Sequence, residues 1–188
     1  MKEIEILVRV MDEETDHVLK KLHQEATYKE TSSVKDTYYY DPLRSNLTPN
    51  DRLEITECFR VREKEDQYFL TYKVDHFDET GKWLYSDEDE TKIGDANVMK
   101  RMIQKLGLKE LVIVDMKKYF FEYEEYKIAL EVVQQLGNFL EVESKNRECS
   151  VVELERQKIS DFIQSLNLNV SKEVEAGKPE LLLKKMGY

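Results

Sequence analysis

The sequence predicts an α+β fold in which antiparallel strands dominate and three or four helices lie outside the sheet. Two kinds of repeat lead to this prediction. Apolar and polar residues alternate over many segments of strand length, while a few other segments repeat apolar residues at helical spacing. The 188 residues contain no Gly- or Ser-rich linker, so we expect a single domain over residues 1–188.

The first quarter of the chain predicts a strand, a helix and an extended segment. In MKEIEILVRV, isoleucine and valine alternate with mostly charged residues, which indicates a strand at 3–10 with one buried face. The segment 13–27 places apolar residues on one helical face and predicts an amphipathic helix. VKDTYYYD predicts an extended segment at 34–41, and the loop that we expect at 42–51 holds two of the three prolines.

The middle of the chain contains the clearest hairpin. Alternation on both sides of the polar turn EKED predicts two paired strands over 56–75. KWLYSDEDETK predicts a further strand at 82–92. We then expect a helix at 95–106, with Asp95 as its N-cap and Gly107 as its C-terminal signal.

The last part of the chain predicts three strands followed by two helices. ELVIVDMKKYFF, YKIALEVVQQ and NFLEVES indicate strands at 110–121, 126–135 and 138–144, and the short sequence LGN joins the last two. The remaining segments at about 150–166 and 178–187 predict helices.

The amino-acid composition and net charge limit the kinds of protein and the partners that we expect. Hydrophobic residues make up 40% and charged residues 36% of the chain, as expected for a soluble globular protein. The net charge of −10 argues against nucleic acids and anionic membranes as partners. Cys58 and Cys149 are isolated, and we find neither a leader segment nor a run of 18 apolar residues. We therefore expect a cytoplasmic protein.

Like charges stand two residues apart on several predicted strands. Two carboxylates on one strand face, about 7 Å apart, repel by roughly 2 kcal/mol at an effective dielectric constant near 20. Such a face either lies in water or has a cation between its carboxylates. The pairs are Glu3 with Glu5, Arg60 with Arg62, and Glu141 with Glu143, and Lys73 and Glu131 lie on neighbouring strands.

The order of several short motifs adds a resemblance to these patterns. The motifs are EIE, DTYYYDP, FRVR, FLTYK, DEDE before a helix that ends in LG, and LGNFLEVE. In this order they resemble the CYTH family, the triphosphate tunnel metalloenzymes, and most closely its class IV adenylyl cyclases. The resemblance implies an eight-stranded antiparallel β-barrel, or tunnel, with flanking helices. The tunnel wall would bind a triphosphate and Mg²⁺ or Mn²⁺.

The resemblance also implies roles for individual residues. The expected metal ligands are Glu3, Glu5, Glu131, Glu141 and Glu143, with Glu88 and Glu90 as further acids of the tunnel. The expected substrate contacts are Arg9, Arg60, Arg62, Lys73 and Lys118, and the expected catalytic residues are Glu5, Lys73 and Lys118. Carboxylates suit Mg²⁺, and several cationic side chains are needed to hold a triphosphate, so the chemistry agrees with the resemblance.

Three cationic positions of the family differ in this chain. Leu7 stands where the family has the lysine of Glu-x-Glu-x-Lys. Met116 stands at the first of two inward-facing basic positions, and Lys118 stands at the second. Cyclase-like members also have an arginine where this chain has Ser86 or Asp87.

These differences predict a less positive tunnel and weaker binding of a triphosphate. Lys117 and Lys92 are two nearby residues that would restore part of the charge if they faced inward. The missing cations bear on turnover more than on the fold.

Two functions of different classes fit these observations. The first is a metal-dependent enzyme that binds ATP, thiamine triphosphate or tripolyphosphate and either hydrolyses it or cyclises ATP. The alternative is a catalytically weakened protein of the same fold that binds phosphorylated ligands, as Leu7 suggests. A third reading is a structural domain whose charged barrel does neither. We expect a monomer or a homodimer.

Overall fold

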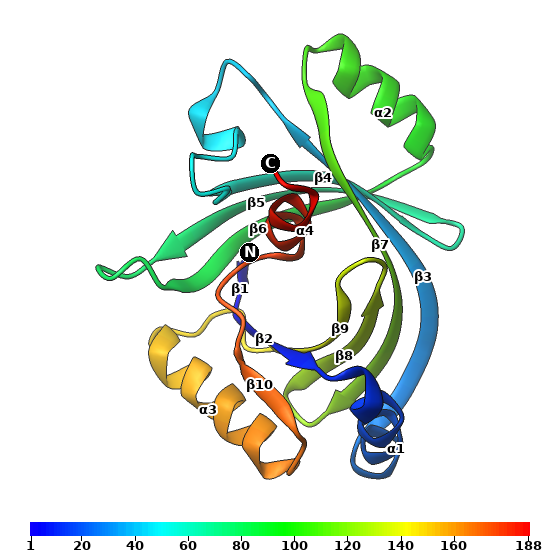
Figure 1. The fold of residues 1–188 in the computed structure, drawn as a ribbon, viewed down its shortest axis with the longest axis vertical. Helices are drawn as coiled ribbons and strands as arrows, with labels where there is room; N and C mark the ends of the chain where they lie inside the picture. Colours follow the sequence, from blue (N-terminus) through cyan, green and yellow to red (C-terminus); the bar gives the residue numbers. More distant parts are fainter.

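The computed structural model describes residues 1–188 and contains one ten-stranded sheet with four α-helices (Figure 1). The strands are β1 (Lys2–Glu3), β2 (Glu5–Val10), β3 (Thr27–Tyr40), β4 (Glu57–Lys64), β5 (Gln67–Phe77), β6 (Trp83–Ile93), β7 (Lys109–Tyr123), β8 (Tyr126–Val133), β9 (Gly137–Ser144) and β10 (Val170–Glu173). The helices are α1 (Thr15–Glu25), α2 (Ala96–Lys105), α3 (Val152–Ser165) and α4 (Lys178–Met186), and short 3-10 turns lie at Asp12–Glu14 and Ser45–Leu47.

The sheet is antiparallel throughout and curls around α4 (Figure 1). Its strand order is β1-β6-β5-β4-β3-β7-β8-β9-β2-β10. Only Ile4 separates β1 from β2, yet β1 pairs with β6 and β2 pairs with β9. The N–H of Glu88 donates to the carbonyl of Met1 at 2.8 Å, and the N–H of Ser144 donates to the carbonyl of Ile4 at 2.9 Å. The first ten residues therefore pair with three strands from distant parts of the chain, because β2 also pairs with β10.

The predicted α+β class, with an antiparallel sheet and flanking helices, is confirmed, whereas the eight strands predicted for the β-barrel differ from the ten strands of the curled sheet. One reason is that the predicted strand at 3–10 changes partner at Ile4 and divides into β1 and β2. The other is β10, a four-residue strand that sequence alternation did not indicate. It pairs with β2 alone, and so short a segment carries too few residues to show a period.

The predicted helices form, with small shifts at their ends. Asp95 is the N-cap of α2, and its carboxylate accepts from the N–H of Val98 at 2.9 Å, as predicted. The first helix ends at Glu25, and β3 begins at Thr27, earlier than the extended segment predicted at 34–41. The added residues TYKETSS are mostly polar and exposed, so no alternation marked them, but they pair with β7. None of the helices is both long and apolar enough to cross a membrane.

Packing on the outer face of β2 decides which way its charged residues point. Ile4, Ile6, Val8 and Val10 are buried in a core cluster with residues of α1 and α3, among them Val18 and Ile159. Successive residues of a strand point to opposite faces. Glu3, Glu5, Leu7 and Arg9 therefore face the inside of the curled sheet. The charged residues of this strand therefore do not lie on the outer face of the sheet.

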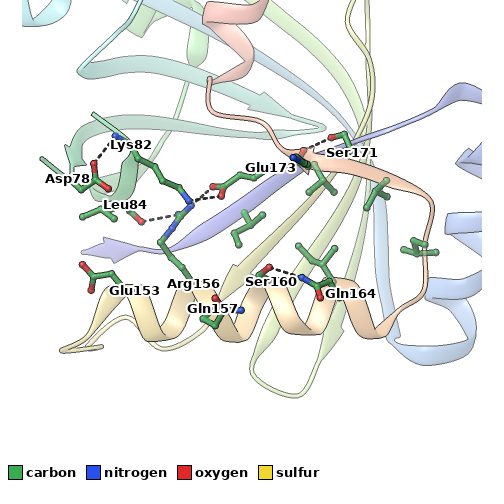
Figure 2. A pocket seen from close by; sticks show the side chains of 16 residues that line it. Asp78, Lys82, Leu84, Glu153, Arg156, Gln157, Ser160, Gln164, Ser171 and Glu173 are labelled. Atoms are coloured by element: carbon green, nitrogen blue, oxygen red, sulfur yellow. Dashed lines mark hydrogen bonds and ion pairs between the residues drawn. The ribbon is translucent and has the colours of Figure 1, made fainter. Parts of the chain in front are cut away.

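Arg156 of α3 contacts β2, β6 and β10 on the outer face of the sheet. Its Nη1 atom donates to the carbonyls of Glu5 at 3.1 Å and Leu84 at 3.0 Å, and its Nη2 atom contacts the Glu173 carboxylate (Figure 2). The guanidinium carbon lies 4.9 Å from the centre of the Trp83 ring. One buried side chain thus ties β2, β6 and β10 together from outside the sheet.

We expect Arg156→Met to lower the free energy of unfolding by about 2 kcal/mol, because two carbonyls lose their donor and the partly buried Glu173 carboxylate keeps only its pair with Lys82. Chemical denaturation measures this change. Gln157→Met, at an exposed neighbouring position of α3, is the control and should change stability by less than about 0.5 kcal/mol. Equal stability of the two variants would show that the contacts of Arg156 with these strands do not stabilise the fold.

Candidate functional site

Charged side chains from nine strands and from α4 meet inside the curled sheet. All but the exposed Glu90 are buried or partly buried, and most form ion pairs with one another. The carboxylates are Glu3, Glu5, Asp36, Glu88, Glu90, Glu131, Glu141 and Glu143. The cationic side chains are Arg60, Arg62, Lys73, Lys118 and Lys178. We call this set the tunnel cluster.

Two arginines of β4 surround Asp36 of β3. Arg62 forms a bidentate pair with Asp36, with Nε and Nη2 at 2.8 and 2.7 Å from the two carboxylate oxygens. Arg60 lies 3.5 Å from Asp36 through Nη1 and 3.6 Å from Glu88 through Nη2. Burial would raise the pKa of Asp36, but the two guanidinium groups hold it well below its usual range. This carboxylate is therefore charged and fixes both arginines. Asp36 was not predicted as a site residue, although it opens the DTYYYDP motif.

Two strand lysines each lie between two further carboxylates of the tunnel cluster. The ammonium group of Lys73 contacts Glu3 and lies 3.1 Å from Glu88. The ammonium group of Lys118 contacts Glu131 and lies 3.6 Å from Glu141. Burial disfavours the charge of Lys73, yet the nearby glutamates raise its pKa well above the usual value. Lys73 is thus held charged in the interior.

Lys178, the first residue of α4, contributes a cation that the sequence did not predict. Its ammonium group lies 2.7 Å from Glu131 and 2.5 Å from Glu141. These two carboxylates raise the pKa of the Lys178 ammonium against the effect of burial. Lys178 begins a helix, so the alternation of residues along strands could not indicate that it faces the tunnel. Only the packing of α4 inside the sheet shows where its ammonium group lies.

Glu5 is the one tunnel carboxylate that forms neither an ion pair nor a hydrogen bond through its side chain. Burial, together with the neighbouring Glu141 and Glu3, raises the pKa of Glu5 well above its usual value. Glu143, opposite Glu5 in the β2–β9 register, instead pairs with Lys127 at 3.0 Å and with Arg147. Lys73 and Lys178 act on Glu5 from farther away and lower its pKa, but neither forms an ion pair with it.

The residues that replace the family's basic positions have other contacts. Leu7 and Met116 lie in or against an apolar cluster that includes Leu182 and Leu183 of α4. Ser86, opposite Glu3 in the β1–β6 register, donates a hydrogen bond to Asp75 at 2.6 Å. The interior thus has an apolar part filled by α4 and a charged part beside it.

Three further lysines and arginines lie apart from the tunnel cluster. The guanidinium group of Arg9 donates to the carbonyl of Leu136 at 2.7 Å and stacks on Phe139, and it reaches no carboxylate. Lys117 is exposed and lies over the ring of Tyr119. Lys92 is also exposed. Neither lysine restores the charge that Leu7 and Met116 remove.

The donor atoms suit a divalent cation, although the side chains are not gathered around one. No group of three or more His, Cys, Asp or Glu side chains is arranged to hold a metal ion, because lysines occupy most of the carboxylates. Carboxylate oxygens are nonetheless the ligands that Mg²⁺ and Mn²⁺ prefer. Glu5 is uncompensated, and both buried oxygens of Glu131 lack a hydrogen bond of good geometry. The residues present therefore fit a metal once the lysines move to another anion.

A second cavity of about 600 Å³ lies outside the tunnel, between α3, β2, β6 and β10 (Figure 2). Its lining includes the apolar outer face of β2, at Ile6 and Val8, and the charged Lys82 and Glu173. Lys82 pairs with Glu173 at 3.4 Å, and Arg156 is engaged by backbone carbonyls. Six charged side chains line this cavity, whereas thirteen meet in the tunnel cluster, so the tunnel cluster is the better candidate site.

The raised pKa of Glu5 predicts a pH dependence of stability. The folded pKa lies above the ordinary value of 4.5, so the metal-free fold loses stability as pH rises from about 4.5 through that folded pKa. We expect Glu5→Gln to remove this loss and to raise the free energy of unfolding at pH 7–8 by about 1 kcal/mol or more. Denaturation curves between pH 4 and pH 8, with chelator present, measure it.

The control for this prediction is Glu13→Gln at an exposed position. It should leave the pH profile of the wild-type protein unchanged. An identical profile for Glu5→Gln and the wild type would show that Glu5 is not held among uncompensated charges.

Comparisons with known proteins identify relatives and solved structures of the same fold. A candidate adenylate cyclase of Methanocaldococcus jannaschii, MJ0240, is 27% identical over 170 residues, which are 90% of this chain and 91% of that protein. The PH1819 protein of Pyrococcus horikoshii has the same fold, with a TM-score of 0.81, 24% identity and coverage of 97% and 99% of the two chains. HpAC1 of Hippeastrum, an adenylyl cyclase candidate described with a dominant triphosphatase activity, matches with a TM-score of 0.66 at 14% identity, over 99% and 95% of the chains.

The strongest finding concerns the family and confirms the resemblance seen in the motifs. A model of the CYTH domain matches residues 1–176, which is nearly the whole chain. This chain belongs to the CYTH domain family.

Proposed function

We propose that this protein is a metal-dependent enzyme that binds a triphosphate in the tunnel and hydrolyses it. The observation that carries the proposal is the convergence of buried Arg60, Arg62, Lys73 and Lys118 from three strands, next to a surplus of carboxylates. Cyclisation of ATP is the alternative reaction. The name of MJ0240 supports cyclisation, and the activity described for HpAC1 supports hydrolysis.

The charges inside the tunnel make a divalent cation necessary for this function. The eight carboxylates of the tunnel cluster outnumber its five cationic side chains. A triphosphate brings about four further negative charges, and like charges at short range in a weakly solvated interior repel strongly. Mg²⁺ or Mn²⁺ held by these carboxylates would supply positive charge against the phosphates and reverse this balance. Binding of the triphosphate should therefore require the metal.

We assign roles to the tunnel residues on this basis. Glu3, Glu5 and Glu141 would hold the cation, with Glu131 and Glu143 beside them. When bound, the cation would neutralise charge on the phosphate oxygens and activate a water molecule. Arg60 and Arg62, fixed by Asp36, would orient the phosphate chain.

Lys73 and Lys118 would leave their glutamate partners for the transferred group and stabilise the charge that develops on it. Their present contacts with Glu3 and Glu131 keep them poised in the interior.

A second candidate function rests on the positions that lost a cation. Leu7 and Met116 are apolar, and Ser86 is neutral, so the wall has fewer free positive charges than the resemblance implies. A tunnel of this kind would bind a phosphorylated ligand without turning it over. The two candidates predict the same ligand and differ only in whether a product forms.

We expect purified protein with Mg²⁺ or Mn²⁺ to release phosphate from at least one of ATP, thiamine triphosphate and tripolyphosphate. Lys73→Met should lower this activity by about 100-fold or more, because it removes a cation that stabilises the transferred group. Phosphate release and nucleotide chromatography measure hydrolysis and cyclisation together.

The matched control is Lys92→Met on β6, whose exposed ammonium lies outside the tunnel cluster. It should keep wild-type activity. Calorimetric binding of a triphosphate without any product would favour the binding protein, and neither binding nor product with either metal would exclude both functions.

A further inference from the structure

The cation position next to Glu141 is the feature that carries a further inference. In the register of β2 and β9, Leu7 stands directly opposite Glu141. Facing residues of an antiparallel pair have Cβ atoms about 4.5–5.5 Å apart. A lysine at position 7 would therefore lie within reach of the Glu141 carboxylate. That carboxylate is instead met by Lys178 of α4, at 2.5 Å.

Lys178 is held firmly at this position. Its side chain is 12% exposed, and its ammonium group lies between Glu141 and Glu131. Glu180, one helical turn from the start of α4, accepts from the N–H of Ile55 at 2.7 Å and from the N–H of Gly177. The beginning of α4 is thus fixed to the loop before β4, so Lys178 is aimed into the tunnel by the fold.

Leu7 helps α4 to lie inside the sheet. Its side chain packs against the apolar cluster that contains Leu182 and Leu183. Its carbonyl accepts from the N–H of Val174, which precedes α4, at 2.8 Å. A charged side chain at position 7 would have to enter this apolar cluster or displace Lys178. The leucine and the helix-borne lysine therefore suit one another.

We propose a coupled exchange between positions 7 and 178. Lys178 of α4 supplies the phosphate-contacting cation that the first strand lacks, and Leu7 provides the apolar surface on which α4 packs. As to the ligand, this inference rests on the proposed triphosphate function. Lys178 lies among the carboxylates, whereas Arg9 of the first strand does not. On arrival of a triphosphate it would leave Glu131 and Glu141 free for the metal.

The first experiment needs no ligand and uses four full-length proteins: the wild type, Lys178→Met, Leu7→Lys and the double variant. In the wild type, Leu7→Lys should lower Tm by several degrees, because it places a second ammonium group beside Lys178 in an apolar cluster. In the Lys178→Met background the same change should raise Tm, because the new lysine can pair with Glu141. A change of the same sign in both backgrounds would overturn the exchange.

The second experiment measures the affinity for tripolyphosphate with Mg²⁺ by calorimetry. Lys178→Met should weaken binding by about tenfold or more, and Leu7→Lys in that background should recover most of it. Lys178→Arg keeps the charge and should bind within a few-fold of the wild type. Lys184→Met, exposed on the same helix, is the matched control and should bind as the wild type does.

The two experiments separate the possible failures. A wild-type protein that binds no tripolyphosphate refutes the proposed function, while the sign reversal in Tm still decides whether positions 7 and 178 share one cation site. A wild type that binds, with unchanged affinity in folded Lys178→Met, refutes the role of Lys178 in ligand binding and leaves the proposed function intact.

Discussion

The pairing of buried carboxylates with cations from other strands is the constraint on which this structure depends. Glu131 and Asp36 are almost completely buried, and an unpaired buried charge would be strongly destabilising. Their partners come from β4, from β7 and from α4, which are far apart in the sequence. The curled sheet brings these partners together, so the folding of the chain and the assembly of the candidate site are one event.

The division of the interior into two parts follows from the docking of α4. Its leucines fill the apolar part with Met116 and Phe139, and its first lysine enters the charged part. An apolar cluster beside ion pairs excludes water and strengthens their electrostatic interactions. The helix therefore completes the apolar core and also excludes water from the charged part, where a phosphate group would bind.

The strand residues of the site could be predicted from the sequence because alternation is a local property. Glu3 with Glu5 and Arg60 with Arg62 fall on the predicted strands, and packing of Ile4 against α3 confirms the inward direction of the first pair. The partner change at Ile4 and the entry of Lys178 depend on contacts between the ends of the chain, which no local period records. Arg9 shares the inward face by alternation, yet a carbonyl and the Phe139 ring hold it away from the carboxylates.

Glu5 shows how the fold maintains an unfavourable charge at the candidate site. Inside the tunnel, burial together with the nearby Glu141 and Glu3 raises the pKa of its carboxyl group, and no cationic side chain forms an ion pair with it. Outside the tunnel its carbonyl accepts a hydrogen bond from Arg156, which also holds β6 and β10. If the backbone were free, repulsion would be relieved by moving β2 away from β9. The pairing of β2 with β9 opposes that movement, so protonation or a nearby positive charge would have to relieve the repulsion instead.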